Sequence, residues 1–315
     1  MWTAIALWTL TLGGIALYAA WGVDAIARGA STWLVVGGAP LVYLGIVATF
    51  MALYFAVAWI FRARRPREQR IGFAATLRLV ANEFRALAGS GRRMMLYRLL
   101  VREPPAAPAD LPVLLVHGVL CNAGVWADFA RKLGAKGIAP VYTISYGPPL
   151  APIDTFAAQL AQRIDAILAA TGARDLVTVA HSMGGLVVLA YCRRHGAGKI
   201  RRAISLATPY RGSVHAWGFF GACLAQLRPG NPWLAALEQA PFGRPPMTSV
   251  WSWHDSMVAP QTSSRLPGAD NVELSGVGHN AIVADPEAFA VVVAAIAAAR
   301  RQAPAARPAT SGSPA

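Results

Sequence analysis

The sequence predicts an α/β protein with a mainly parallel, doubly wound sheet, preceded by two transmembrane helices. From residue 111 onward, short apolar runs alternate with longer stretches of helical periodicity, as right-handed βαβ units require. A sharp turn of small residues joins the apolar run 176–179 to the next helical stretch. The N-terminal region differs, because two long stretches there carry no charge. A chain of 315 residues is long enough for one large α/β domain with an appendage.

The N-terminal appendage is a predicted transmembrane hairpin over residues 1–61. Its uncharged stretches, 2–22 and 33–61, reach the roughly 20 apolar residues that a bilayer span needs. Asp24 and Arg28 are the charged residues of the short connection between them. A cleaved signal peptide is the competing interpretation of the first stretch. Against it, no basic residue precedes that stretch and a second apolar stretch follows directly.

Residues 62–110 form a basic connection to the α/β domain. The part from 62 to 103 holds 11 arginines and 3 acidic residues, a net charge of +8 in a chain whose total is +14. A basic belt beside apolar helices favours anionic lipid headgroups as a partner, and no nucleic-acid-binding motif accompanies it. The positive-inside rule places this flank in the cytoplasm, together with both termini and the following domain.

A helix is predicted within residues 71–100, where apolar side chains recur at helical spacing between arginines. Its apolar positions are Leu77, Val80, Phe84 and Leu87. Two placements are open for this helix, one on the membrane surface and one packed against the following domain. A linker rich in proline and alanine, 104–109, ends the connection.

The α/β domain is expected over residues 111–301. Its predicted strands are 111–116, 140–145, 176–179, 202–206, 248–252 and 271–274, and its predicted helices are 125–133, 154–171, a helix directly after Ser182, and 286–301. The tail, 302–315, is rich in alanine, proline and serine and is predicted to be disordered. The three cysteines of the chain show neither a disulfide framework nor paired metal-ligand spacing.

The segment Ala180-His181-Ser182-Met183-Gly184-Gly185 is the clearest chemical signal in the chain. It lies between a strand-like run and a helical run, which is the setting of a nucleophile elbow. Such a turn exposes a serine hydroxyl at the edge of a sheet and needs small flanking residues, since strand and helix come very close there. Ala180 replaces the first glycine of the usual Gly-x-Ser-x-Gly pattern, and a methyl group is small enough to fit.

A serine nucleophile needs a histidine base and a carboxylate that orients it. His279 is the predicted base, because it follows the last strand in a glycine-rich loop. His215 and His254 remain possible, whereas His195 lies too close along the chain to return to the serine. Asp255 is the predicted acid, because it follows a strand. The alternatives are Asp270, which precedes a strand, and Asp285, which is expected to begin a helix beside Pro286.

Ester hydrolysis also needs backbone N–H groups that bind the oxyanion. The residue after the nucleophile, Met183, supplies one, and the loop after the first strand supplies the other. Val119 is the predicted second donor and Leu120 the alternative. His117 is expected to shape this loop by hydrogen bonding and not to act as an acid or base.

Residues 214–247 are predicted to form a lid over the acyl-binding site, because they are long, aromatic and apolar and lie between the serine and Asp255. The side chains expected to contact substrate are Trp217, Phe219, Phe220 and Leu224. The alternative interpretation is ordinary core packing of two helices. An apolar lid beside a membrane-anchored domain favours acyl chains over small polar esters.

Several separated motifs, in order along residues 112–286, resemble bacterial lipases and lipase-like esterases of the α/β-hydrolase superfamily. The motifs are Val116-His117-Gly118, Cys121-Asn122 with Trp126, the stretch from Ala180 to Val187, Ser205 to Ser213, Pro229-Gly230-Asn231, Asp255 to Pro260, and Gly276 to His279. The resemblance implies an α/β-hydrolase fold and carboxylic-ester hydrolysis through an acyl-enzyme, with no redox cofactor. It also implies that Ser182, Asp255 and His279 act together.

The predicted function is therefore that of a membrane-anchored serine ester hydrolase, a lipase or esterase, with lipid or acyl-ester substrates. The expected location is a bacterial-type inner membrane, spanned twice, with the catalytic domain in the cytoplasm. A thioesterase or acyltransferase that uses the same three residues is an alternative, and a non-catalytic membrane adaptor is another. No metal cluster is evident in the sequence, although scattered carboxylates leave a structural calcium open.

Overall fold

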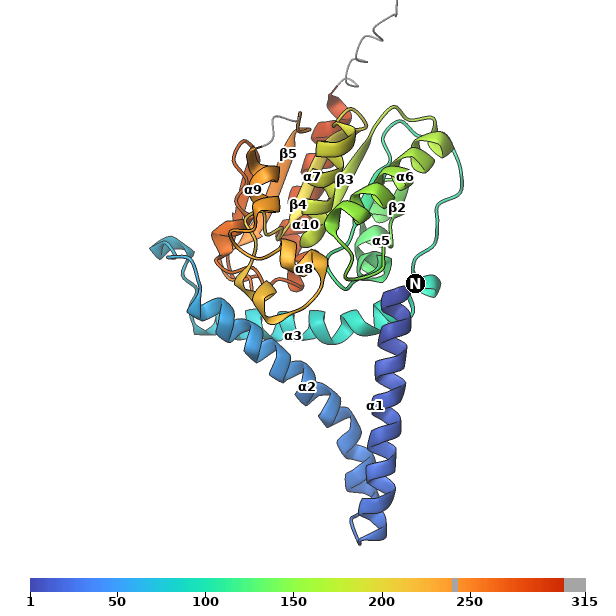
Figure 1. Ribbon diagram of the computed structural model, residues 1–315, viewed down its shortest axis with the longest axis vertical. Coiled ribbons are helices and arrows are strands. Elements are labelled where there is room, and N and C mark those ends of the chain that lie inside the picture. The colour runs from blue at the N-terminus through green and yellow to red at the C-terminus, as the bar shows by residue number, and fades with distance from the viewer. Residues whose placement is uncertain (240–242, 303–315) are drawn as a thin grey trace, which may run out of the picture.

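The computed structural model describes residues 1–239 and 243–302, and its centre is a six-stranded, wholly parallel sheet in the order β2-β1-β3-β4-β5-β6 (Figure 1). Adjacent strands pair in parallel along the whole order. The strands are β1 (Val113–Val116), β2 (Val141–Thr143), β3 (Leu176–His181), β4 (Ile200–Leu206), β5 (Met247–Ser252) and β6 (Asp270–Leu274). This arrangement confirms the predicted fold class.

Helices cover both faces of the sheet. On one face lie α6 (Ile153–Thr171) and α7 (Met183–His195), and on the other lie α5 (Ala127–Ala135) and α10 (Pro286–Arg301). Strand β1 contributes side chains to the apolar cores on both faces of the sheet. Leu114 and Val116 lie in one core, and Val113 and Leu115 lie in the other. This alternation is the two-residue period of a strand that is buried on both sides.

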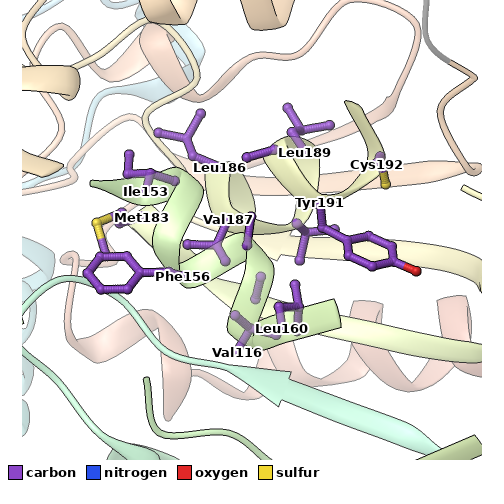
Figure 2. Close-up of a cluster of buried hydrophobic side chains, with 14 of the residues drawn as sticks. Val116, Ile153, Phe156, Leu160, Met183, Leu186, Val187, Leu189, Tyr191 and Cys192 are labelled. Atoms are coloured by element: carbon purple, nitrogen blue, oxygen red, sulfur yellow. The ribbon is translucent and has the colours of Figure 1, made fainter. Parts of the chain in front are cut away.

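The first core is densely filled where α6 and α7 meet the sheet (Figure 2). Phe156 and Leu160 of α6 lie beside Met183 and Val187 of α7 in this cluster, and all four are fully buried. Burial of a large apolar side chain contributes roughly 1.5–3 kcal/mol. This packing fixes the start of α7, and therefore the turn that carries Ser182, against the rest of the domain.

Two long apolar helices, α1 (Trp2–Ala27) and α2 (Thr32–Ile60), project from one end of the domain and converge at their far tip (Figure 1). Among the described residues, these are the helices long and apolar enough to cross a membrane. Only 11% of the most apolar window of α1 and 17% of that of α2 is buried. Their apolar side chains thus mostly face outward, unlike those of a core helix.

Helix α3 (Phe73–Met95) lies crosswise between the two apolar helices and the domain, and the short helix α4 (Tyr97–Leu100) follows it (Figure 1). Its buried side chains are Leu79, Glu83 and Met94. The predicted apolar positions are elsewhere on the helix: Leu77 and Val80 are exposed and Phe84 and Leu87 half-buried. The helix therefore packs on the domain with one face and turns the predicted apolar face away from it.

Short elements fill the loops at the carboxyl edge of the sheet. They are the 3₁₀ turns η2 (Ala123–Trp126), η3 (Val214–Gly218), η4 (Gln261–Ser264) and η5 (Ala281–Val283) and the helices α8 (Ala222–Gln226) and α9 (Pro232–Gln239), with η1 (Arg67–Gln69) earlier in the basic connection. The predicted linker 104–109 holds no helix or strand. Most of the predicted tail, from 303 to 315, lies outside the described residues.

Candidate active site

Ser182 occupies the sharp turn between β3 and α7, with φ 55° and ψ −130°. A non-glycine residue in this region of backbone space is strained by about 1–3 kcal/mol and persists only where its surroundings hold it. Here the Ser182 N–H donates to the Leu206 carbonyl at 2.8 Å, and its carbonyl accepts from the Thr208 hydroxyl at 2.8 Å. Both contacts come from β4 and the loop after it, so the neighbouring strand fixes the turn.

Three glycines permit the close approach of chain segments around Ser182. A Cβ at Gly118 would lie 2.9 Å from the Ser182 Cβ, and one at Gly184 would lie 2.6 Å from the Val116 carbonyl oxygen. A Cβ at Gly185 would overlap the Thr208 side chain. Real Cβ atoms do not come this close to other atoms, so these positions need glycine for reasons of space.

The structure brings the three predicted residues of the triad together. Nε2 of His279 lies 3.0 Å from the Ser182 hydroxyl oxygen, and Nδ1 of His279 lies 3.0 and 2.9 Å from the two carboxylate oxygens of Asp255. Asp255 is held in turn by the N–H groups of Met257 and Val258, at 2.8 and 2.7 Å. All three side chains are buried. The carboxylate accepts the Nδ1 proton, which leaves the Nε2 lone pair facing the hydroxyl.

The alternative bases have other partners. The ring of His215 donates from Nε2 to the Tyr54 carbonyl at 3.1 Å, and Nδ1 of His254 accepts from the Gly276 N–H at 3.0 Å. His195 ends α7 and stacks on Tyr191.

The alternative acids also lie away from the serine. Asp270 forms an ion pair with Arg202 at 3.2 Å. Asp285 caps α10 by accepting from the N–H groups of Glu287 and Ala288. Among the described residues, no group of three or more His, Cys, Asp or Glu side chains has a metal-binding arrangement.

The histidines of the site differ in their pKa. Burial alone would lower the pKa of His279, but the charge of Asp255, its hydrogen bond and the charge of Glu83 together raise that pKa above its ordinary value. Burial lowers the pKa of His117 to about 4, of His181 to about 3 and of His254 to about 4. His279 is therefore the buried histidine best prepared to accept a proton near neutral pH.

The predicted oxyanion donors lie where the chain passes Ser182. Met183 is the first residue of α7, and the first N–H groups of a helix have no partner within it and point outward at its positive end. The loop with Val119 follows Gly118, where a Cβ would lie 2.9 Å from the Ser182 Cβ. In that loop the ring of His117 stacks on Tyr146 with a centroid distance of 4.0 Å, and its Nδ1 donates to the Gly118 carbonyl.

Backbone strain in the described chain is concentrated at this edge of the sheet. Its non-glycine residues with positive φ are Leu120, Ser182 and Ala207. They follow β1, β3 and β4, three neighbouring parallel strands whose carboxyl ends meet at one edge. Strain of this kind tends to cluster at functional sites.

Exposed apolar side chains form a rim at the same edge. Within the described part of the domain, 111–239 and 243–302, the exposed large apolar residues are Leu120, Leu150, Trp217, Phe219 and Phe220. All lie in loops that follow β1, β2 or β4. Of the predicted lid residues, Leu224 differs, because it is buried in the core that covers α6 and α7. Residues 240–242 of the predicted lid lie outside the described residues. Its described part combines an exposed aromatic turn, 217–220, with helices that pack on the core.

The apolar helices flank this edge. The Thr3 hydroxyl of α1 donates to the Cys121 carbonyl at 3.1 Å, beside the predicted oxyanion loop. At the other side, the Tyr54 carbonyl of α2 accepts from His215 in the aromatic turn, and the Ala63 N–H donates to Gln261 at 3.1 Å. The candidate site therefore faces the N-terminal helices and not the far side of the domain.

Sequence reasoning missed one residue of this site, Glu83. Its carboxylate is buried and accepts hydrogen bonds from Ser256, Asn280 and Ala281, next to Asp255 and His279. A signal was present, since Glu83 is the one acidic residue within an otherwise basic helix α3.

The parallel sheet with helices on both faces has the α/β-hydrolase fold. Residues 112–252 match the family described as alpha/beta hydrolase fold. The non-heme chloroperoxidase CPO-A1 of Kitasatospora aureofaciens is 34% identical over an alignment of 109 positions, which covers 30% of this chain. The match covers 36% of that protein, so the chain spans about a third of the length of this curated relative.

Solved lipase structures share the same fold. The mature form of lipase BlEst2 from Bacillus licheniformis superposes with a TM-score of 0.53 at 18% identity, over 61% of this chain and 95% of the other. Lipase B from Aspergillus fumigatus superposes with a TM-score of 0.57 at 17% identity, over 81% of each chain. At such identities the likeness concerns the fold alone.

Proposed function

We propose that this protein is a membrane-anchored serine hydrolase that cleaves carboxylic esters of acyl chains. The observation that carries the proposal is the chain of hydrogen bonds from the Ser182 hydroxyl through His279 to Asp255, at a strained turn. The lipase neighbours support an ester as the substrate class. Fold alone does not define an activity, so the proposal depends on the geometry of these side chains.

Acylation begins when the Ser182 oxygen attacks the acyl carbonyl carbon while Nε2 of His279 takes the hydroxyl proton. The carbonyl π electrons move to its oxygen, and the N–H groups of Met183 and Val119 bind the resulting oxyanion. As the tetrahedral intermediate collapses, the C–O bond to the alcohol breaks and His279 returns the proton to the leaving alkoxide. Asp255 stabilises the imidazolium that exists between the two transfers.

Deacylation repeats these steps with water. His279 takes a proton from a water molecule, whose oxygen attacks the acyl-serine carbonyl, and the same N–H groups bind the second oxyanion. The collapse breaks the bond to the Ser182 oxygen, which regains its proton from His279. The products are a carboxylic acid and the free enzyme, so the cycle needs no redox cofactor.

The membrane part of the proposal depends on where apolar surface is exposed. A helix of 26 residues such as α1 is about 39 Å long, more than the roughly 30 Å of a bilayer's hydrocarbon core. The exposed rim of the domain lies at the edge that α1, α2 and α3 flank. We therefore propose that the hairpin spans a membrane and that the site faces the lipid surface, from which acyl esters reach it.

The orientation follows from charge. The N-terminus lies beside the domain, at the same end of the hairpin as the basic segment that follows α2 (Figure 1). Arg62, Arg64, Arg65, Arg67 and Arg70 lie in that segment. The positive-inside rule places it and the catalytic domain in the cytoplasm, against anionic headgroups. A cysteine-accessibility map of the hairpin connection and the domain would test this topology.

The first experiment compares the wild-type protein with Ser182→Ala in detergent micelles on p-nitrophenyl esters of increasing acyl length. We expect activity that vanishes in the variant, with a chain-length optimum that separates an esterase from a lipase. Equal activity in both proteins would remove Ser182 from the mechanism. If neither protein is active on esters, thioester hydrolysis and acyl transfer to added alcohols test the alternative chemistry of the same residues, and a fluorophosphonate probe reports whether Ser182 is activated at all.

A further inference from the structure

Glu83 brings a carboxylate into the site from outside the hydrolase fold. It belongs to α3, yet its residue is only 1% exposed. Its oxygens accept from the Ser256 hydroxyl at 2.7 Å, the Asn280 N–H at 3.0 Å, the Asn280 side-chain amide at 2.9 Å and the Ala281 N–H at 2.9 Å. A carboxylate has about four acceptor positions, and donors meet all of them here. This donor set suits an ionised carboxylate, which only accepts.

These donors lie directly beside the candidate catalytic residues. Ser256 follows Asp255 in the loop after β5, and Asn280 and Ala281 follow His279 in the loop after β6. The Ser256 hydroxyl oxygen also receives a long hydrogen bond from the His279 N–H, at 3.4 Å. One side chain of α3 therefore joins the loop of the acid to the loop of the base.

The fit around the carboxylate is tight. A Cβ at Gly278, one residue before His279, would collide with the Glu83 side chain. The other end of α3 is also fixed to the domain, because the Asn122 side-chain amide donates to the Met94 carbonyl at 2.9 Å. Helix α3 is thus held at the loop of the base and near the predicted oxyanion loop.

We propose that Glu83 is a positioning residue, which holds the loops of His279 and Asp255 in their reactive arrangement, so that α3 completes the active site of the hydrolase domain. The proposal rests on the function proposed above for Ser182, His279 and Asp255. It makes the basic helix a working part of the site and not only a connection between the hairpin and the domain.

Two consequences follow from the chemistry of a buried carboxylate. Its removal leaves several buried donors without an acceptor, and such groups cost about 1–3 kcal/mol each unless the chain rearranges. The loop that rearranges is the one that carries His279, and a displacement of about 1 Å in a catalytic group can cost about 100-fold in rate. The loss is therefore expected in kcat, because the acyl-binding surface lies on other loops.

The second consequence is electrostatic. Four titratable groups surround His279: Asp255 in the loop after β5, Glu83 in α3, His181 at the end of β3, and His215 in η3. Burial lowers the pKa of both neighbouring histidines, which leaves them neutral near pH 7. The negative charge of Glu83 adds to that of Asp255 in favouring protonated His279. Loss of the Glu83 charge therefore lowers the pKa of His279 and moves the acidic limb of the rate profile to lower pH.

The test compares Glu83→Gln with Glu68→Gln, which makes the same chemical change at an exposed position of the basic connection. Both are measured as full-length proteins in micelles on a soluble p-nitrophenyl ester between pH 5 and 9. For Glu83→Gln we expect kcat to fall by about 100-fold with KM changed by less than about threefold, and the acidic limb to move to lower pH. Glu68→Gln should match the wild type. Glu83→Asp, which keeps the charge, should restore the acidic limb but only part of kcat.

A second measurement does not depend on turnover. In full-length protein with Ser182→Ala, the titration of the His279 ring followed by ¹⁵N NMR should move to lower pH when Glu83→Gln is added and stay unchanged with Glu68→Gln. This separates the two proposals: ester hydrolysis that survives Ser182→Ala overturns the proposed function, whereas an unmoved His279 titration overturns the role of Glu83. A thermal-stability loss in Glu83→Gln with kcat and the acidic limb unchanged would also overturn it, because Glu83 would then only dock α3.

If Glu83→Gln does not fold, Ser256→Ala removes one of the donors and leaves α3 intact. A fall in kcat, smaller than that of Glu83→Gln, is then expected, while the His279 titration stays near its wild-type position because the Glu83 charge remains. An unchanged kcat would contradict the proposal.

Discussion

The two halves of the candidate site are built in different ways. The serine half is held by the sheet itself: Ser182 hydrogen-bonds to Leu206 and Thr208, and Gly118 and Gly184 let the end of β1 and the start of α7 come close. The histidine half lies on loops after β5 and β6, and its support comes from Glu83 in α3. The first half is part of the common fold, and the second depends on a segment that precedes the fold in the chain.

This difference separates what the fold provides from what the N-terminal region adds. A turn fixed by strand pairing keeps its shape as long as the sheet is intact. Loops fixed by a side chain from another element keep theirs only while that element stays docked. Substitutions that disturb these supports should therefore differ in kind. Those beside the Ser182 turn should mainly lower stability, and those beside the His279 loop should mainly lower the rate.

The largest expected effect is on the histidine half. Asp255→Asn keeps the shape of the side chain but replaces the carboxylate with an uncharged amide, which no longer holds the proton on Nδ1 of His279. We therefore expect kcat/KM to fall by about 10³–10⁴-fold. Steady-state kinetics on a soluble ester measures this. The control is Asp270→Asn. Asp270 pairs with Arg202 at the start of β6, away from the loop that carries His279, so this variant should remain within about twofold of the wild type. A similar loss in both variants would mean that Asp255 is not the acid that orients His279.

The serine half should respond in stability. A methyl group at Gly184 would meet the carbonyl oxygens of Val116 and His117, so Gly184→Ala should lower the free energy of unfolding by about 1–3 kcal/mol. Gly134→Ala is the matched control, because Gly134 lies in α5 with no atom within 4 Å of its Cβ position. The control should gain about 0.5–1 kcal/mol. Denaturant unfolding in micelles compares them, and equal stability of the two variants would contradict the close approach at the elbow.

The exposed rim tests whether both halves meet substrate at a lipid surface. Phe220 is 88% exposed, and Phe220→Ser should lower the rate on an ester embedded in anionic vesicles by about 5- to 30-fold, since about 1–2 kcal/mol of apolar contact is lost. The loss on a soluble ester should be smaller. Ala169→Ser, at an exposed position of α6, serves as the control. Equal losses on the two substrates would place Phe220 at the acyl chain and not at the membrane.

The smallest effect concerns pH. Since the pKa of His279 is raised above its ordinary value of about 6.5, the neutral base is lost as pH falls through that raised value. The acidic limb of kcat/KM should therefore have its midpoint above pH 6.5. A midpoint well below this value would mean that Asp255 and Glu83 do not outweigh the burial of the imidazole. A profile of the wild-type protein from pH 5 to 9 decides between these outcomes.

Much of the serine half could be predicted from sequence because its determinants are local. Ser182, the glycines beside it and the run of strand β3 lie within a few residues of one another, and each has its own physical reason. The predicted bounds of the six strands agree with the observed bounds to within a few residues at each end, because buried strands are apolar on both faces. The arrangement of Ser182, His279 and Asp255 in space also follows the predicted grouping, although their catalytic roles stay a prediction.

The parts that sequence did not predict depend on distant contacts. The buried face of α3 differs from the predicted apolar face, because Leu79 and Glu83 pack on the domain while Leu77 and Val80 do not. A buried acid in a basic helix is invisible to hydrophobic periodicity, since its partners lie 173 to 198 residues away. The position of Leu224 in the core likewise reflects packing against α6 and α7, which no local pattern specifies.

The long separation between Glu83 and Asn280, 197 residues, also sets the order of events during synthesis. At roughly 5–20 residues per second, the ribosome needs about 10 to 40 seconds to reach Asn280 after Glu83 has been made. During that interval the apolar helices and α3 have already left the peptidyl transferase centre, and the Glu83 carboxylate does not yet have its hydrogen-bond partners. Under the proposed membrane anchorage, we expect the nascent chain to reach a membrane before the candidate site acquires its final arrangement. The proposed activity would therefore begin only after the loop that carries His279 and Asn280 had been translated.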